Sequence, residues 1–411
     1  MFDEIRANQR RTVVLVTAMA LLLVAMGYVF AESAQPGAGV FGVVIAIVIW
    51  IFMSLISYFQ GDSIFLTLSR AKRIEKKDHP VLFNVVEEMC VASGIPQVPA
   101  IYIMDEKALN AFATGRDYRH ASVAVTSGLL ENLNRDELQG VIAHELGHVK
   151  NRDILYIMML GVMLGTIILI ADAGRRFMRF GSYTRTAPRR GKGSGQLQMI
   201  MIVLAILLMI LAPVIARLLY LAVSRRREYL ADASSALYTR FPDGLANALE
   251  KLSGSSEKLQ GASQAMAPMY IVNPLVTTAG RLSDLSSTHP PISQRVRILR
   301  AMGGENGLRA YDEAARSVTG RPVGLLAFVE TKELTPSASP PRPLLPVAVA
   351  NPDSHPQRVR TTTDLLWKLN QYVFIACECG TNLKVPPHYQ GQTVACPHCE
   401  KAHSVSTLRR D

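Results

Sequence analysis

Residues 141–153 read V-I-A-H-E-L-G-H-V-K-N-R-D, a stretch that carries two histidines four positions apart with a glutamate after the first. On a helix, positions i and i+4 lie on one face, so His144 and His148 could bind one Zn²⁺ through neutral imidazole nitrogens. Glu145 would then stand beside them as a general base for a water molecule activated by the metal. A motif of five residues also occurs by chance on ordinary helices, so a third ligand is needed.

A carboxylate that could complete this site comes much later, in the run S-R-R-R-E-Y-L-A-D at residues 224–232. Catalytic zinc commonly takes two histidines and one glutamate and keeps a fourth position open for water. Glu228 is the candidate third ligand, and Asp232, one helical turn further on, could orient a ligand imidazole. Taken alone, Glu228 would more often be a surface charge that balances the three arginines before it.

Four long apolar stretches are typical of membrane spans, since about 18 or more apolar residues suffice to make a candidate. They are Thr12–Phe30, Gly39–Phe59, Ile154–Ala171 and Met199–Val223. The first is longer than the apolar core of a secretory signal, and the second follows at once, so we expect an uncleaved anchor.

The distribution of Lys and Arg predicts how the first two spans are oriented. Basic residues flank this hairpin on both sides, whereas the connecting loop at 31–38 has none. The positive-inside rule therefore places both ends of the hairpin, and His144 with them, in the cytoplasm. The loop between the third and fourth stretches is also basic, so these segments either cross against the rule or form a hairpin that dips into the membrane. In both cases Glu228 lies on the same side of the membrane as His144.

The chain has 44 Lys and Arg against 33 Asp and Glu, a net charge of +11. The basic clusters flank the apolar stretches, where anionic lipid attracts them. No basic stripe alternates with aromatic residues, so nucleic acid is not an expected partner. The expected partners are the lipid bilayer and polypeptide substrates.

Two short segments before the histidines, residues 100–104 and 121–126, are rich in Val, Ile and Ala and are predicted to be strands. The segment N-A-F-A-T-G at 110–115 lies between them. Strands beside a metal-bearing helix predict a mainly α, α+β fold with an edge strand on which an extended peptide could pair.

The C-terminal part of the chain has a different composition. Residues 333–360 are rich in Pro, Ser and Val, which predicts an extended linker. The motifs C-E-C-G at 377–380 and C-P-H-C at 396–399 follow. They predict a small Cys₄ zinc ribbon with a closed, structural site, and the alternative is a redox-active cysteine pair. The four candidate ligands are Cys377, Cys379, Cys396 and Cys399. The partner of the ribbon is left open.

Four earlier motifs occur in the order A-F-A-T-G at 111–115, H-E-L-G-H at 144–148, R-E-Y-L-A-D at 227–232 and T-H-P-P at 288–291. Together they resemble the M48 family of integral-membrane zinc metallopeptidases, most closely its bacterial heat-shock branch. The resemblance covers about residues 1–300 and implies a gluzincin-type fold. It also implies that zinc is held by His144, His148 and Glu228 and that Glu145 is the general base. The eukaryotic prenyl-protein proteases share the motifs, but they resemble a design with more membrane spans.

The same resemblance implies roles outside the metal ligands. His289, which from its position before two prolines could equally be part of a surface turn, would stabilise the tetrahedral intermediate. Arg295 would hold the ligand carboxylate, and the substrate backbone would bind along a short segment. That segment is Asn110, Ala111, Phe112 and Ala113.

The expected organisation is a transmembrane hairpin at 1–60, a cytoplasmic-facing metallopeptidase domain at 61–300, a linker at 301–365 and a ribbon at 366–411. Apolar segments 154–171 and 199–223 interrupt the peptidase domain. The expected function is zinc-dependent cleavage of misfolded or damaged membrane proteins at the bacterial inner membrane. Two alternatives remain: a zinc-ribbon adaptor on an inactive peptidase scaffold, and a processing protease with one dedicated substrate.

Overall fold

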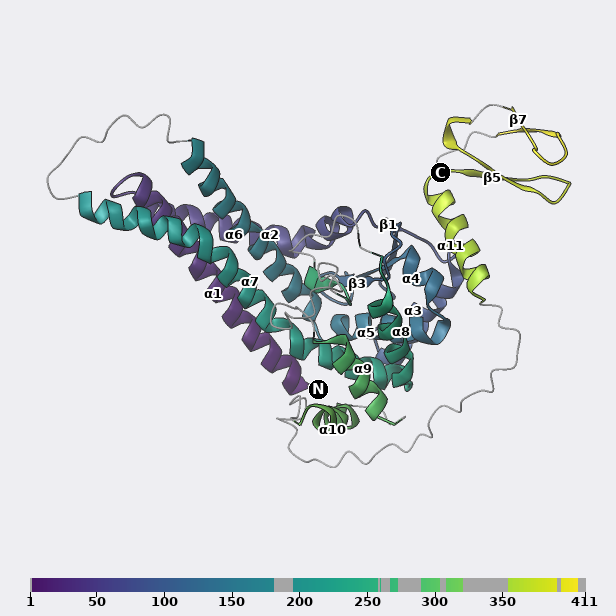
Figure 1. Ribbon diagram of the computed structural model, residues 1–411, viewed down its shortest axis with the longest axis horizontal. Helices are drawn as coiled ribbons and strands as arrows, with labels where there is room; N and C mark the ends of the chain where they lie inside the picture. The colour runs from purple at the N-terminus through teal and green to yellow at the C-terminus, as the bar shows by residue number, and fades with distance from the viewer. Residues whose placement is uncertain are drawn as a thin grey trace.

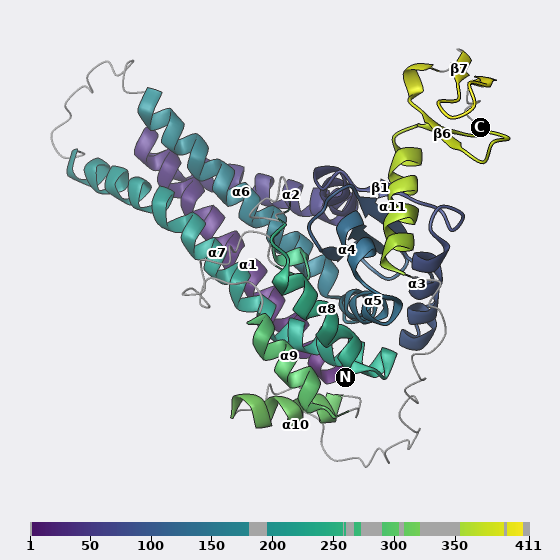
Figure 2. The same ribbon diagram turned by 45° about the vertical axis from the view of Figure 1, so that its right-hand side comes forward.

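The computed structural model describes residues 2–180, 195–257, 259, 267–272, 290–303, 308–320, 354–389 and 393–405. A bundle of long helices projects to one side of a domain of shorter helices and strands (Figures 1 and 2). The long helices are α1 (Phe2–Ala34), α2 (Gly39–Leu68), α6 (Asp153–Phe180) and α7 (Gly195–Thr239).

Each of these four helices contains an apolar segment long enough to cross a membrane: Val13–Ala34, Gly39–Leu68, Asp153–Arg176 and Gln196–Tyr220. α1 and α2 approach closely, since a Cβ on Gly27 would lie 2.5 Å from the carbonyl oxygen of Gly42. Large apolar side chains on the outer faces, such as Phe41 and Val203, are more than half exposed, as lipid-facing residues would be. α6 and α7 pack beside α1 and α2 around a shared core that includes Met26.

The domain beside the helix bundle contains a sheet of four short strands in the order β1-β2-β4-β3. These strands are β1 (Lys72–Arg73), β2 (Ala100–Met104), β3 (Ala111–Thr114) and β4 (Ser122–Thr126). β2 and β4 are parallel, and β3 runs antiparallel to β4 at the edge of the sheet. The helices of this domain are α3 (Pro80–Ser93), α4 (Ser127–Asn132), α5 (Arg135–Lys150), α8 (Pro242–Gly254) and α9 (Ile292–Ala301). The 3₁₀ turn η2 (Ala267–Met269) contacts both β3 and α6.

The expected linker at 301–365 differs from the structure, which has α10 (Leu308–Thr319) and most of α11 (His355–Leu369) within it. α10 packs on α9 and α7, and its buried face consists mainly of Tyr311, Ala314 and Ala315. Leu308, Tyr311, Ala315 and Val318 recur at helical spacing, so the sequence does contain the pattern of a helix here, although the expected linker covered it. α10 therefore packs as part of the same domain as α9.

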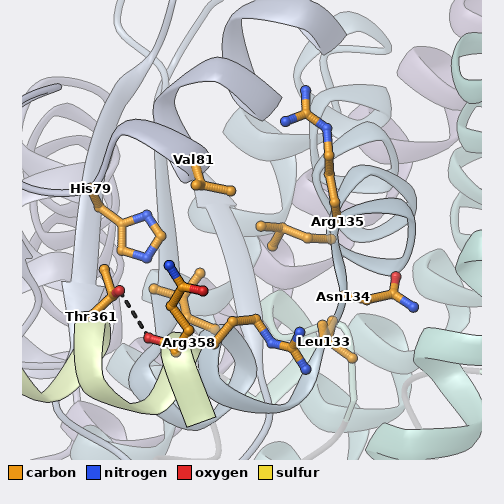
Figure 3. A pocket seen from close by; sticks show the side chains of 10 residues that line it. His79, Val81, Leu133, Asn134, Arg135, Arg358 and Thr361 are labelled. Atoms are coloured by element: carbon orange, nitrogen blue, oxygen red, sulfur yellow. Dashed lines mark hydrogen bonds between the residues drawn. The ribbon is translucent and has the colours of Figure 1, made fainter. Parts of the chain in front are cut away.

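The helix α11 joins the C-terminal ribbon to this domain by packing on α4. Leu365 of α11 is buried, and Arg358 Nε donates to the carbonyl oxygen of Glu131. Figure 3 shows Arg358 and Thr361 facing His79 and Asn134 across a hollow of about 80 Å³. The ribbon is thus attached beside the N-terminus of α5.

The ribbon consists of two antiparallel hairpins and a short 3₁₀ turn, η5 (Pro387–Tyr389). One hairpin pairs β5 (Val373–Ala376) with β6 (Asn382–Val385), and the other pairs β7 (Thr393–Ala395) with β8 (Ala402–Ser404). Only three aliphatic side chains in its described part are fully buried: Leu383, Val385 and Val405. A core this small needs a further constraint to hold its fold.

Candidate active site and its metal ligands

The helix α5 positions the two histidines and the glutamate of the H-E-L-G-H motif. It begins with a capping box, in which Asn134 Oδ1 accepts from Glu137 N and Glu137 Oε2 accepts from Asn134 N. Gly140 is needed where α5 meets α8, since a Cβ there would lie 2.6 Å from the backbone nitrogen of Leu245. This close packing buries the whole face of α5 that carries the motif.

His144, His148 and Glu228 lie together, although 79 residues and two long helices separate the second histidine from the glutamate. His144 Nε2 is 3.6 Å from Glu228 Oε2, and His148 Nε2 is 3.5 Å from Glu228 Oε1. Ligand atoms bound tetrahedrally to zinc at about 2.1 Å are about 3.4 Å apart. The three side chains therefore have the spacing of a zinc site.

The chemistry of these atoms also fits a cation. His144 Nε2 is buried and forms no hydrogen bond with any residue that the structure describes. The imidazole rings of His144 and His148 meet edge to face with centroids 4.9 Å apart, so each can present a nitrogen to one point. A buried polar atom without a partner costs free energy, and a metal ion at this point would remove that cost.

A second layer of charged side chains lies against the two imidazoles. Asp232 Oδ1 lies 3.0 Å from His144 Nδ1, and Asp153 Oδ2 lies 3.5 Å from His148 Nδ1. Carboxylates in this position set the tautomer of a metal-binding histidine and leave Nε2 for the metal. Burial lowers the pKa of His148, but hydrogen bonds and charges from Asp153 and Glu228 outweigh burial and raise it to about 10.

Arg295 connects α9 to this layer. Its Nε and Nη2 donate to the two oxygens of Asp232 at 2.9 and 2.6 Å, and its Nη1 lies 3.4 Å from Glu228 Oε2. The Tyr311 hydroxyl donates to Asp232 Oδ2 at 3.2 Å. Arg295 is completely buried, so its charge is balanced by these two carboxylates instead of by water.

Three residues of this layer were not predicted: Asp153, Arg227 and Tyr311. Asp153 begins α6, five residues after His148, and Arg227 Nε lies 3.4 Å from Asp153 Oδ1. The only available signal was the position of Asp153 and Arg227 next to the two motifs. Tyr311 reaches the site from α10, so no local pattern could have indicated it.

Glu145 is buried beside the histidines on the side of β3. Burial raises the pKa of Glu145, and the charges of the two histidines oppose that shift. The nearby backbone N–H of Ala113 also acts to lower this pKa, but burial outweighs it. Glu145 is thus a buried carboxyl group with a raised pKa.

The predicted substrate-binding segment Asn110–Ala113 lies at the edge of the sheet, in and just before β3. Residues 271 and 272 already form hydrogen bonds with part of this edge. Ile271 N donates to the carbonyl oxygen of Ala111 at 3.0 Å, and Asn110 Nδ2 donates to the carbonyl oxygen of Val272 at 2.9 Å. Phe112 packs edge to face on Tyr270. The predicted His289 lies outside the described residues.

The four cysteines of the ribbon form a second cluster. Cys377 Sγ lies 3.4 Å from Cys399 Sγ, and Cys379 Sγ lies 3.7 Å from Cys396 Sγ. These distances exceed a disulfide bond and approach the spacing of about 3.8 Å for thiolates held tetrahedrally by zinc at about 2.3 Å. The cluster has the geometry of a closed Cys₄ site.

Comparisons with known proteins agree with this geometry. The model of peptidase family M48 matches residues 76–303. A "Protease HtpX homolog" of Dictyoglomus thermophilum is 42% identical over 302 residues, which cover 74% of this chain and 95% of that protein. The homolog of Streptococcus uberis is 39% identical over 306 residues, covering 74% of this chain and 100% of the relative.

A crystal structure of S. mikatae Ste24p aligns with 71% of this chain and 64% of its own, at 18% identity and a TM-score of 0.36. The family model ends at residue 303, so the cysteine cluster lies beyond it. The matched region contains the motif helix α5, the whole of α6 and α7, and Arg295. The chain belongs to peptidase family M48 and is a zinc metallopeptidase of the membrane.

Proposed function

We propose that this protein is an endopeptidase whose catalytic Zn²⁺ is held by His144, His148 and Glu228. The observation that supports the ligand set most strongly is the spacing of 3.5 and 3.6 Å between the histidine nitrogens and the glutamate oxygens. We further propose that the ribbon cysteines hold a second, structural zinc, so that one chain binds two ions. Asp232 and Asp153 orient the histidines, and Arg295 positions both Asp232 and Glu228.

Zinc bound at this site supplies Lewis-acid polarisation of a carbonyl group and makes a water molecule more acidic. Glu145 accepts the proton from the attacking water and returns it to the amine that leaves, and its raised pKa suits both transfers. His289 remains the proposed group that stabilises the oxyanion.

The substrate backbone pairs with β3 in this proposal. A peptide that adds to this edge competes with Ile271 for the carbonyl oxygen of Ala111, so substrate binding requires that hydrogen bond to open. Because the hydrogen bonds of strand addition involve only backbone groups, they are independent of the substrate's side chains. A site of this kind suits unfolded segments of many proteins, which supports a quality-control role over cleavage of one dedicated substrate.

We place the active site on the cytoplasmic side of the bacterial inner membrane. The support comes from the Lys and Arg residues on both outer sides of the first hairpin and from their absence at 31–38. We also propose that α6 and α7 cross the membrane fully, since they pack along α1 and α2. A reporter inserted within residues 191–195 tests this crossing: an external signal supports it, and a cytoplasmic signal refutes it.

The central test measures zinc content and cleavage of an unfolded membrane protein by the full chain in nanodiscs. Glu145→Gln should keep both zinc ions and lose cleavage by at least about 10²-fold, the lower end for general acid–base catalysis. Glu250→Gln on the exposed side of α8 is the matched control and should cleave as the wild type does. Near-normal turnover in Glu145→Gln would remove it from the mechanism, and bound zinc without cleavage in the wild type would favour the adaptor.

A further inference from the structure

A hollow of about 560 Å³ lies beside strand β2. Its wall contains residues from five separate segments: α2, the stretch that follows it, α3, residues 97–102 at the start of β2, and residues 119–122, where the turn after β3 meets β4. The residues that matter for its charge are Asp62, Arg73, Lys76, Glu87 and Arg119. The hollow shares no lining residue with the metal centre.

The depth of this hollow relative to the membrane follows from α2. Residues 39–59 of α2 contain no charged side chain, and at about 1.5 Å per residue they span about 30 Å, the thickness of the hydrocarbon core. Tyr58 and Phe59 close this run and are 42% and 57% exposed, as aromatic residues of the interfacial belt are. Asp62, one turn later, therefore lies at the level of the lipid headgroups.

Arg116 fixes the turn between β3 and β4 at the same level. Its guanidinium carbon lies 5.6 Å from the ring centroid of Tyr58 and 6.0 Å from that of Phe59. Cation–π contacts of this kind attach the turn to the end of the span. Arg119, three residues further on, is thereby brought to the headgroup layer together with the rest of the wall.

Two basic side chains on the wall, Arg73 and Arg119, could bind an anionic ligand. Lys76 Nζ lies 2.7 Å from Glu87 Oε2, so this pair is neutral as a unit. No ion pair of Arg73 or Arg119 is found within the described residues, although Arg119 lies 5.7 Å from the ring centroid of Tyr118. Lys77 and, more weakly, the charge of Arg73 lower the pKa of Glu75. Both arginines are exposed, and Asp62 is the one remaining carboxylate on the wall.

We propose that this hollow binds the headgroup of an anionic phospholipid, with Arg73 and Arg119 on its phosphate. Arginine suits phosphate because its planar guanidinium donates two parallel hydrogen bonds. The acyl chains of such a lipid would lie along the exposed rings of Tyr58 and Phe59. The bilayer is the source of the ligand, since the hollow opens at the depth where the headgroups are.

The proposal is tested by binding of phosphatidylglycerol to the full chain in phosphatidylcholine nanodiscs. Each basic residue near a lipid surface contributes about 1 kcal/mol, so the double variant Arg73→Gln, Arg119→Gln should bind phosphatidylglycerol about 30-fold more weakly. The matched control is Lys77→Gln, Arg297→Gln, which removes the same charge from exposed positions outside the hollow. All three proteins should have the same zinc content.

Three results would overturn the proposal. The first is unchanged lipid binding in the double variant, and the second is an equal loss in the control, which would mean attraction by net charge alone. The third is binding of inorganic phosphate that depends on Arg73 and Arg119 in the absence of anionic lipid, which would identify a free anion as the ligand. A selective loss of phosphatidylglycerol binding, with no such phosphate binding, supports it.

Discussion

Replacing Arg295 by methionine tests whether the buried charges around the metal centre depend on one another. Arg295 is fully buried and bound to both oxygens of Asp232, which is itself inaccessible to water. Methionine keeps most of the side-chain volume but leaves Asp232 and Glu228 without this cation. Breaking a buried ion pair by removing one partner costs about 3–5 kcal/mol. That is a large part of the total stability of a domain, about 5–15 kcal/mol.

Arg300 on the same helix provides the matched comparison. It pairs with Asp243 at 2.6 Å, as close as the contact in the buried pair, but both side chains are more than a third exposed. Exposed pairs contribute about 0–1 kcal/mol, so Arg300→Met should hardly change stability. Because the shortest contact is 2.6 Å in both ion pairs, a difference in stability between the two variants reports the effect of burial on the pair.

Thermal unfolding of the detergent-solubilised, metal-free protein measures the difference. With about 2–4 °C per kcal/mol for a domain of this size, Arg295→Met should lower Tm by about 6–20 °C. Arg300→Met should lower it by about 4 °C at most. Equal shifts in the two variants would refute the claim that Arg295 balances the carboxylates of the site.

Three further predictions concern the two metal sites. Asp153→Asn should weaken zinc binding at the catalytic site by about 10–100-fold, as measured by competition with a chelator, because His148 loses a charged orienting partner; unchanged affinity would exclude this role. Cys396→Ser should leave one zinc per chain by elemental analysis, and loss of both ions or of neither would contradict two separate sites. Because its pKa is raised, His148 keeps its proton at neutral pH, and zinc must displace that proton to bind. The apparent Kd for zinc should therefore fall about tenfold for each pH unit between about pH 7 and about pH 9. A zinc affinity that is independent of pH would contradict this prediction.

The sequence predicted what depends on local spacing. Two histidines at i and i+4, with a glutamate after the first, define one helix face whatever surrounds it, and the apolar spans are visible as composition. The features that were missed depend on how distant elements meet. Ile271 reaches β3 across more than 150 residues, and Tyr311 reaches Asp232 from 79 residues further along the chain. No periodicity within a short window encodes such contacts.

The helix α7 is a single element of 45 residues that holds a membrane-length segment up to Tyr220 and the proposed ligand Glu228 beyond it. No contiguous fragment of the chain contains all three proposed ligands without including two membrane-length segments, so truncation that keeps the proposed metal site also keeps both segments. Glu228 lies about 12 Å past the end of the span at 1.5 Å per residue, and a change in tilt of about 10° would move it by about 2 Å. Such a displacement is comparable to a zinc–ligand bond, so we expect metal affinity at the proposed site to depend on bilayer thickness.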